Sequence, residues 1–265
     1  MSGGNHDIAS KLGFALPGSK FRRPAARPGI VARTALVGQL VNTRAPVITV
    51  AAPPGYGKTT LLAQWAERIG SRAAWLSCDE GDNDPVVLLS ALAVALDRIG
   101  PVDPAIFPAL ASSGADITMV PRFVSAVASV QPPVTVLLDH AEAVTNKQCL
   151  NTIAEFALRL PPGWRLALAS RTAVPLPAAR LRTLGGIFEV TADDLVMGLS
   201  EARSLLKGAG VETGEASLRD LLQRTEGWPA GLYIAGRPRG SRRTPCRRRP
   251  SAMPRRPETT TGWPG

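Results

Sequence analysis

Short apolar runs alternate with stretches of helical periodicity through the central part of the chain. Between the runs, apolar residues recur every three or four positions, as they do on one face of a helix. This alternation is typical of a parallel sheet covered by helices on both faces, so we predict an α/β fold. The five predicted strands occupy residues 46 to 51, 72 to 77, 134 to 139, 165 to 170 and 187 to 191.

Turn and capping residues set the ends of the predicted helices. One helix begins at Lys58 and ends before Gly70, because glycine is common just beyond a helix C-terminus. Another follows Asp84, a good capping residue, and has Pro85 in its first turn, where a backbone N–H is not needed. That helix is predicted to run to residue 99, and two more cover residues 119 to 130 and 145 to 160.

The strand pattern stops after residue 191, and three short amphipathic segments follow. They cover residues 199 to 210, 215 to 227 and 228 to 236, and Ser200 is the predicted N-cap of the first. We interpret these segments as a small helical lid attached to the sheet domain.

The composition changes abruptly at Gly236. Residues 236 to 265 hold nine arginines, six prolines and a single acidic residue, too little apolar material for a core, so we predict that they are disordered. The preceding residues hold 22 basic and 20 acidic side chains, so the formal net charge of +10 belongs mostly to this tail. A shifted reading frame in GC-rich DNA would produce such a change, and a natural basic arm is the alternative.

The rest of the composition argues against several classes of protein: disulfide-stabilised, zinc-binding, membrane-spanning and secreted. Three scattered cysteines and only two histidines support neither a disulfide framework nor a zinc site. The longest apolar stretch of helical character, residues 85 to 96, is shorter than the roughly 20 residues that span a bilayer. The N-terminus also lacks the pattern of a secretion signal. We therefore expect a cytoplasmic protein without a membrane partner.

One loop carries the strongest chemical signal in the chain. The segment AAPPGYGKTT, residues 51 to 60, matches a phosphate-binding P-loop, except that Ala52 stands where the pattern has its first glycine. The segment lies between a predicted strand and a predicted helix, where backbone N–H groups and a helix N-terminus can hold a phosphate. A methyl group at Ala52 costs little if that residue keeps a negative φ. We interpret the loop as a working nucleotide site.

Each polar or flexible residue of the loop has a predicted role in binding ATP or ADP. Gly55 and Gly57 give the open turn, and Lys58 is expected to reach the β- and γ-phosphates. The Thr59 hydroxyl is the predicted Mg²⁺ ligand, and Thr60 completes the nucleotide-binding set.

A second strand supplies the metal-binding and catalytic candidates. The run VTVLLD ends in Asp139, where P-loop proteins carry a carboxylate that holds Mg²⁺ through water. The next residue is His140 instead of a second acid, so Glu142 is the nearest carboxylate able to activate a water molecule. We therefore predict slow ATP hydrolysis or none. Arg171, after the fourth strand, either senses the γ-phosphate or is simply solvated.

Taken together, these blocks resemble the nucleotide-binding module of the MalT-like, LuxR-type transcriptional regulators, which are STAND-class ATPases. The resemblance rests on GIVARTALVGQL, APPGYGKTTLLAQWAER, VLLDHAEAV and EGWPAGL, and it covers residues 20 to 234. It implies a P-loop NTPase three-layer sandwich followed by a helical lid. It also implies that Arg33 lies at the adenine side of the nucleotide, and that Gly227 and Pro229 of the lid lie near the base.

The resemblance also implies a mechanism. In such regulators ADP holds the lid closed, ATP with an inducer opens it and permits self-association, and hydrolysis resets the switch. Relatives contact DNA through a helix-turn-helix domain that we do not find here, so we expect the ATPase end of such a regulator, cut short inside its lid. The expected parts are an arm (1–30), a nucleotide-binding domain (31–195), a truncated lid (196–235) and the tail (236–265).

Two other readings stay open at this point. A P-loop small-molecule kinase or ATPase would need Glu142 as its base. A nonspecific nucleic-acid binder would use the arginine-rich tail, and its affinity would be lost in a chain that ends at Ala235.

Overall fold

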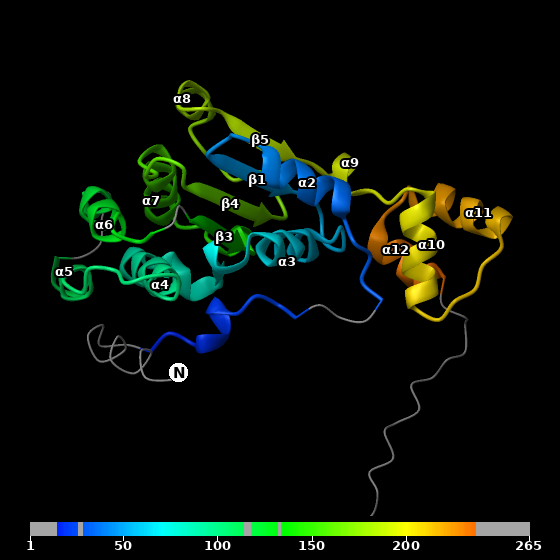
Figure 1. Ribbon diagram of the computed structural model, residues 1–265, viewed down its shortest axis with the longest axis horizontal. Coiled ribbons are helices and arrows are strands. Elements are labelled where there is room, and N and C mark those ends of the chain that lie inside the picture. Colours follow the sequence, from blue (N-terminus) through cyan, green and yellow to red (C-terminus); the bar gives the residue numbers. More distant parts are fainter. Residues whose placement is uncertain (1–14, 26–28, 114–117, 132–133, 237–265) are drawn as a thin grey trace, which may run out of the picture.

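The computed structural model of the protein describes residues 15–25, 29–113, 118–131 and 134–236. Its centre is one sheet of five parallel strands in the order β2-β3-β4-β1-β5 (Figure 1). All five predicted strands are confirmed to within a residue at each end. They are β1 (Val47–Ala51), β2 (Ala73–Ser77), β3 (Thr135–Asp139), β4 (Arg165–Ser170) and β5 (Ile187–Val190).

The strand order brings three separate loops to one edge of the sheet. β4 lies between β1 and β3, and the register places Ala51 beside Ser170 and Ser77 beside Asp139. Because the strands are parallel, the loop after β1 and the ends of β3 and β4 lie at the same edge. A P-loop that joins an interior strand of a parallel sheet to the helix after it, with helices around the sheet, is typical of the P-loop NTPase fold, so the predicted fold class is confirmed.

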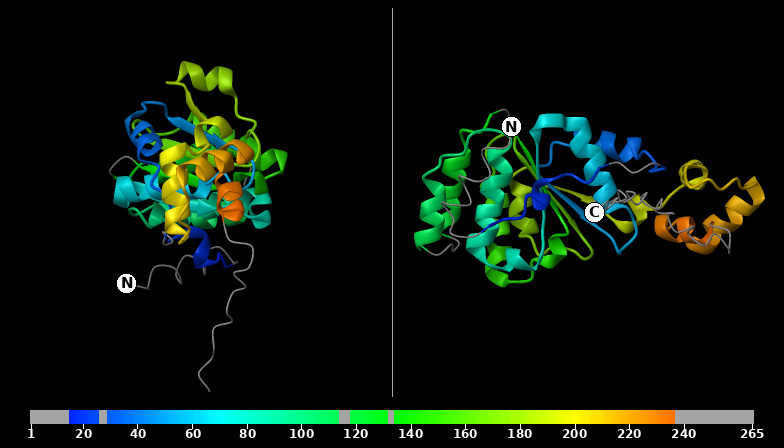
Figure 2. Two further views of the ribbon diagram at one scale, coloured as in Figure 1. Left: turned by 90° about the vertical axis from the view of Figure 1, so that its right-hand side faces the viewer. Right: turned by 90° about the horizontal axis from the view of Figure 1, so that it is seen from below.

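Helices cover both faces of the sheet and make it a three-layer sandwich (Figure 2). Neighbouring residues of β4 point to opposite faces: Leu166 and Leu168 join one apolar cluster, and Ala167 and Ala169 join the other. The first face is covered by α4 (Pro85–Asp97), α5 (Ile106–Ser113), α6 (Met119–Val127) and α7 (Lys147–Leu158). The second is covered by α2 (Thr34–Asn42) and α3 (Lys58–Ile69), and α8 (Ala178–Thr183) precedes β5.

Most predicted helices are present, with shifted ends. The Asp84 side chain accepts hydrogen bonds from the N–H groups of Val86 and Val87, so the predicted cap of α4 is confirmed. The predicted helix at 119 to 130 ends earlier, at Val127, and α2, α5 and α8 were not predicted. α7 begins after Asn146, whose side chain caps it, instead of at residue 145.

The N-terminal segment is built into the sheet domain along β2. Within the short 3-10 helix η1 (Gly18–Phe21), Phe21 belongs to the larger apolar cluster. The buried Lys20 ammonium lies 2.8 Å from carboxylate oxygens of both Asp79 and Asp82. Asp82 is itself fully buried in η3 (Glu80–Asn83). This segment therefore anchors the edge of the sheet next to β2.

The lid follows α9 (Ala192–Leu195), whose Leu195 packs in the second apolar cluster of the sheet domain. It comprises α10 (Leu199–Gly208), α11 (Glu215–Thr225) and α12 (Pro229–Ala235), which lie beyond the carboxyl ends of the strands (Figure 1). The predicted N-cap at Ser200 is wrong: α10 is capped at Gly198, whose N–H donates to Glu201 Oε2. That carboxylate also pairs with Arg33, so a tertiary contact favours the earlier start. Apart from Gly236, the predicted disordered tail lies outside the described residues.

Candidate functional site

The loop between β1 and α3 is an open turn. Gly55 and Gly57 have φ of 83° and 84°, in the left-handed region that favours glycine. Ala52 is not among the described residues with positive φ, and its N–H donates to Ser170 O and so extends the pairing of β1 with β4. The methyl group at Ala52 is therefore compatible with the loop conformation.

The turn leaves a concave set of backbone donors. Within the described part of the chain, the N–H groups of Gly55, Tyr56, Gly57 and Lys58 donate to no protein acceptor. Successive unpaired N–H groups at a helix N-terminus form an anion site, strengthened by the helix dipole. The loop therefore has the donors that a phosphate group needs.

Lys58 closes the loop on itself in this conformation. Its Nζ donates to Ala52 O at 2.6 Å and to Pro53 O at 3.0 Å. Burial lowers the pKa of Lys58, and the negative charges of Glu142 and Asp139 oppose that shift. To reach a phosphate group as predicted, the ammonium would have to leave these two carbonyl oxygens.

The two predicted magnesium ligands are brought together by the fold. Thr59 Oγ1 donates to Asp139 Oδ1 at 3.0 Å, although the residues are far apart in sequence. Asp139 Oδ2 is buried without a hydrogen-bond partner among the described residues, and His140 Nε2 lies 3.5 Å from it. Burial raises the pKa of Asp139. A hydroxyl and an unsatisfied carboxylate oxygen fit Mg²⁺, which prefers oxygen ligands.

Glu142 lies at the mouth of the loop but is already paired. Arg171 Nε is 2.9 Å from Glu142 Oε1, and the Arg171 backbone N–H donates to Glu142 Oε2. His140, held at φ 58°, places its Nδ1 3.6 Å from the same carboxylate. The carboxylate predicted to activate water is therefore engaged with an arginine. A cavity of about 320 Å³ is lined by Pro54, Gly55, Gly57, Lys58, Thr59, Asp139, His140, Glu142 and Arg171.

The lid contacts the loop through carbonyl oxygens. Trp228 Nε1 donates to Pro54 O at 3.1 Å, and Ala230 N donates to Gly55 O at 3.2 Å. Pro229 is buried between these two residues, at the first position of α12. Trp228 was not predicted as a functional residue; the available signal was an indole N–H next to the predicted lid proline. Because the lid uses carbonyl oxygens, the N–H groups of the loop stay available while the lid is closed.

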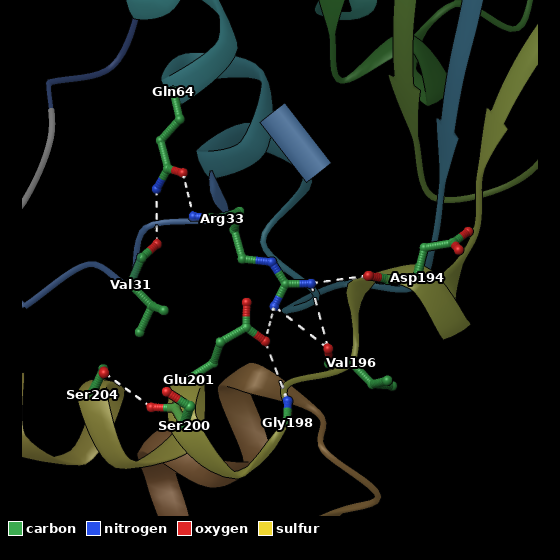
Figure 3. Close-up of polar contacts among 9 residues, drawn as sticks. All are labelled: Val31, Arg33, Gln64, Asp194, Val196, Gly198, Ser200, Glu201 and Ser204. Carbon is green, nitrogen blue, oxygen red and sulfur yellow. Dashed lines mark hydrogen bonds and ion pairs between the residues drawn. The ribbon is translucent and has the colours of Figure 1, made fainter. Parts of the chain in front are cut away.

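Two other predicted nucleotide-binding residues lie outside the phosphate cavity. Arg33 is buried and directs its guanidinium toward the start of the lid (Figure 3). Thr60 lines a neighbouring cavity of about 480 Å³, together with Ile30 and Gln64. Thr59 lines both cavities. The second cavity thus adjoins the phosphate site at the N-terminus of α3.

The chain is similar to parts of two longer bacterial proteins. It is 29% identical over 230 residues to the serine/threonine-protein kinase PknK of Mycobacterium tuberculosis, covering 83% of this chain and 20% of that protein. It is 29% identical over 221 residues to the HTH-type transcriptional regulator MalT of Serratia proteamaculans, covering 82% of this chain and 24% of the regulator. These alignments necessarily include the P-loop, so the predicted resemblance is confirmed for a MalT-like P-loop region. The chain spans a fifth to a quarter of the length of these relatives.

Two further comparisons add less detail. No model of a protein family matches the chain. The solved structure of the Aeropyrum pernix ORC1 protein in complex with DNA is 16% identical and has a TM-score of 0.48, covering 82% of this chain and 60% of that one. Among the described residues, no helix has both the length and the apolar character needed to cross a membrane.

Proposed function

We propose that the protein is an ATP- or ADP-binding switch module of the kind found in MalT-like, LuxR-type transcriptional regulators. The contact between lid and loop carries the proposal. Trp228 and Ala230 bond to loop carbonyl oxygens, so the lid closes over the loop without using the N–H groups that would hold phosphate. Closed lid and bound nucleotide are therefore compatible, and nucleotide can bias the position of the lid.

In this proposal the residues of the loop bind and orient the phosphates. The free N–H groups hold phosphate oxygens, and Lys58 leaves its carbonyl partners to neutralise the terminal phosphates. Thr59 and Asp139 hold Mg²⁺, which when bound supplies positive charge against the phosphate oxygens. Thr59 lines both cavities, so the nucleoside would extend into the second cavity, and the family resemblance implies that Pro229 contacts the base.

Hydrolysis is expected to be slow. Each oxygen of Glu142 already contacts Arg171, so a water molecule would have to compete with the arginine for this carboxylate. His140 follows Asp139 at the position where many P-loop ATPases have a carboxylate that polarises the attacking water, and its neutral imidazole is a poorer match for that task. The proposed enzyme activity is therefore at most a slow ATPase, whose role would be to reset the switch.

The test is thermal unfolding with and without Mg-ATP or Mg-ADP. Ligand at about 100 times its Kd stabilises the folded state by about 2.7 kcal/mol, which corresponds to a rise of several degrees in the melting temperature. Lys58→Ala should abolish the rise, whereas Lys147→Ala, an exposed lysine on α7, should keep it. A cooperatively melting protein that shows no rise with either nucleotide would refute the proposal.

The remaining partner predictions extend this proposal. Self-association would follow opening of the lid, and the module would act in the cytoplasm. Contact with DNA would require a further domain, as in the regulators that the sequence resembles. Size measurement in the presence of ADP and then ATP tests the first point: a change of mass with ATP alone supports it, and an unchanged monomer contradicts it.

A further inference from the structure

A glutamine side chain joins the P-loop helix to the segment that precedes α2. Gln64 Nε2 donates to Val31 O at 2.8 Å, and Gln64 Oε1 accepts from the Arg33 backbone N–H at 2.8 Å (Figure 3). One amide group therefore satisfies two main-chain groups of the same segment, as a neighbouring strand would. This fixes the backbone of residues 31 to 33 relative to α3.

The same helix face carries the nucleotide site. Thr60 and Gln64 are four residues apart, so they lie on one face of α3, and both line the cavity of about 480 Å³. Lys58 and Thr59 begin the same helix. Any shift of α3 on phosphate binding is therefore passed directly to the segment that Gln64 holds.

The segment bound by Gln64 ends in Arg33, which contacts the hinge of the lid. The hinge is the connection between α9 and α10, residues 196 to 198. Arg33 NH2 donates to Asp194 O at 3.0 Å, and Arg33 NH1 lies 3.1 Å from Glu201 Oε2. Both terminal nitrogens also reach Val196 O, at 3.4 and 3.5 Å. The guanidinium thus connects the last residues of α9, the hinge and the first turn of α10 (Figure 3). Its five N–H donors in a rigid fork suit this task.

We propose that Gln64 is a positioning residue that couples nucleotide at the P-loop helix to the lid, by holding the backbone of Arg33. This rests on the proposed nucleotide switch and names how its two halves communicate. Without Gln64, the Arg33 guanidinium keeps its contacts with the lid, but the Arg33 backbone is no longer fixed relative to α3. Nucleotide would then still bind the loop, but it would no longer order the lid.

Amide hydrogen exchange separates these two effects. In the wild type, saturating Mg-ADP should slow exchange both in the loop, at residues 55 to 60, and in the lid, at residues 228 to 232. In Gln64→Met, which keeps the length of the side chain and removes both hydrogen bonds, the loop should still be protected and the lid should lose most of its protection. Gln39→Met, at an exposed position on α2, is the matched control and should behave like the wild type.

A second variant tests the hydrogen bonds themselves. Gln64→Glu keeps an acceptor for the Arg33 N–H, but its carboxylate places a second acceptor against Val31 O. Protonation restores a donor there, so lid protection by Mg-ADP should be weak at pH 8 and recover toward pH 5. Loss of packing alone would give no such recovery, and Gln39→Glu should show no pH dependence beyond that of the wild type.

The outcomes separate this inference from the proposed function. Absence of loop protection in the wild type would refute the nucleotide switch and this inference with it. Loop and lid protection that are both normal in Gln64→Met would overturn the role of Gln64 and leave nucleotide binding intact. Equal loss of both protections, in a variant that melts cooperatively, would likewise overturn it, because coupling would not have been lost selectively. Unchanged pH behaviour in Gln64→Glu would also contradict it.

Discussion

The sheet domain and the lid are held together by different means. The sheet domain has a large apolar cluster on each face, so most of its helices are fixed by extensive burial. The lid has a separate cluster with only four buried residues, Ala202, Leu206, Leu218 and Leu232. Large hydrophobic side chains that stay exposed are concentrated in the lid and its hinge: Val196, Trp228, Tyr233 and Ile234.

This difference predicts which part of the molecule moves more easily. The stabilising free energy from the hydrophobic effect grows with the apolar area removed from water, so the sheet domain is expected to be the more stable unit. The lid is positioned on it mainly by polar contacts of Arg33, Trp228 and Ala230. Contacts of this kind are individually worth about 0.5–1.5 kcal/mol, or somewhat more with a charged group. The free energy of nucleotide binding is therefore large enough to shift the position of the lid.

The largest expected change in the free energy of unfolding comes from the ion pairs of Lys20, which anchor the N-terminal segment to the sheet domain. Lys20→Met leaves Asp82 buried without its cation, and breaking such a buried pair costs about 3–5 kcal/mol. Chemical denaturation should show this loss, whereas the exposed substitution Lys147→Met should change stability little. Hydrogen bonds to Asp79 and Asp82 outweigh burial and raise the pKa of Lys20, so its contribution persists at neutral pH and is lost only in strongly alkaline solution. Equal stabilities of the two variants would contradict the anchor.

A matched pair of leucines compares the two cores. Leu168 in β4 and Leu206 in α10 are both almost fully buried, and Leu→Ala at such sites costs about 2–5 kcal/mol. Leu168→Ala should lower the midpoint of global unfolding. Leu206→Ala should instead speed amide exchange in α10 to α12 and leave the midpoint of the sheet domain nearly unchanged. A single cooperative loss in both variants would show that the lid is not an independent unit.

A matched pair of glycines tests the contact between loop and lid. Alanine at Gly55 or Gly57 meets the same positive φ, which costs about 1 kcal/mol or more. Only at Gly55 would the new Cβ collide with the lid, 2.6 Å from Ala230 Cβ and 2.8 Å from Trp228 Nε1, because nothing lies within 4 Å at Gly57. Both substitutions strain the loop backbone, but only Gly55→Ala should also push the lid away from the loop. Faster exchange of the Ala230 amide in Gly55→Ala than in Gly57→Ala would show this. Identical lid exchange in both variants would refute the contact.

The smallest effect is expected at the buried aspartate. Burial raises the pKa of Asp139, so its ionised form disfavours the folded state without ligand, and stability is lost as pH rises through that pKa. Asp139→Asn should give a small rise in the melting temperature at neutral pH and should remove the effect of Mg²⁺ on nucleotide binding. Asn146→Asp, at an exposed cap, serves as a control for a change between acid and amide. A lower melting temperature of Asp139→Asn would contradict the account.

Local pattern was sufficient for the strands of the sheet domain and for locating the two halves of the candidate phosphate site. The strands, the loop at residues 51 to 60 and the placement of Asp139 at a strand end follow from periodicity and short-range spacing. Parallel strands then brought Thr59 and Asp139 together, as expected. The ends of α6, α7 and α10 were less predictable, because several neighbouring residues can cap a helix. At α10, Glu201 accepts from the Gly198 N–H and also pairs with Arg33, a tertiary contact that the local pattern does not show.

The sequence by itself determined the P-loop, the helical lid and the chemistry of the residues between them. Only the tertiary structure decided the strand order, the burial of Lys20 beside Asp82, the pairing of Glu142 with Arg171, and the path from Gln64 through Arg33 to the hinge. The reason is physical: each of these contacts joins groups far apart along the chain. No local periodicity encodes such a pair, and it forms only when the packed sheet and helices bring both partners to the same place.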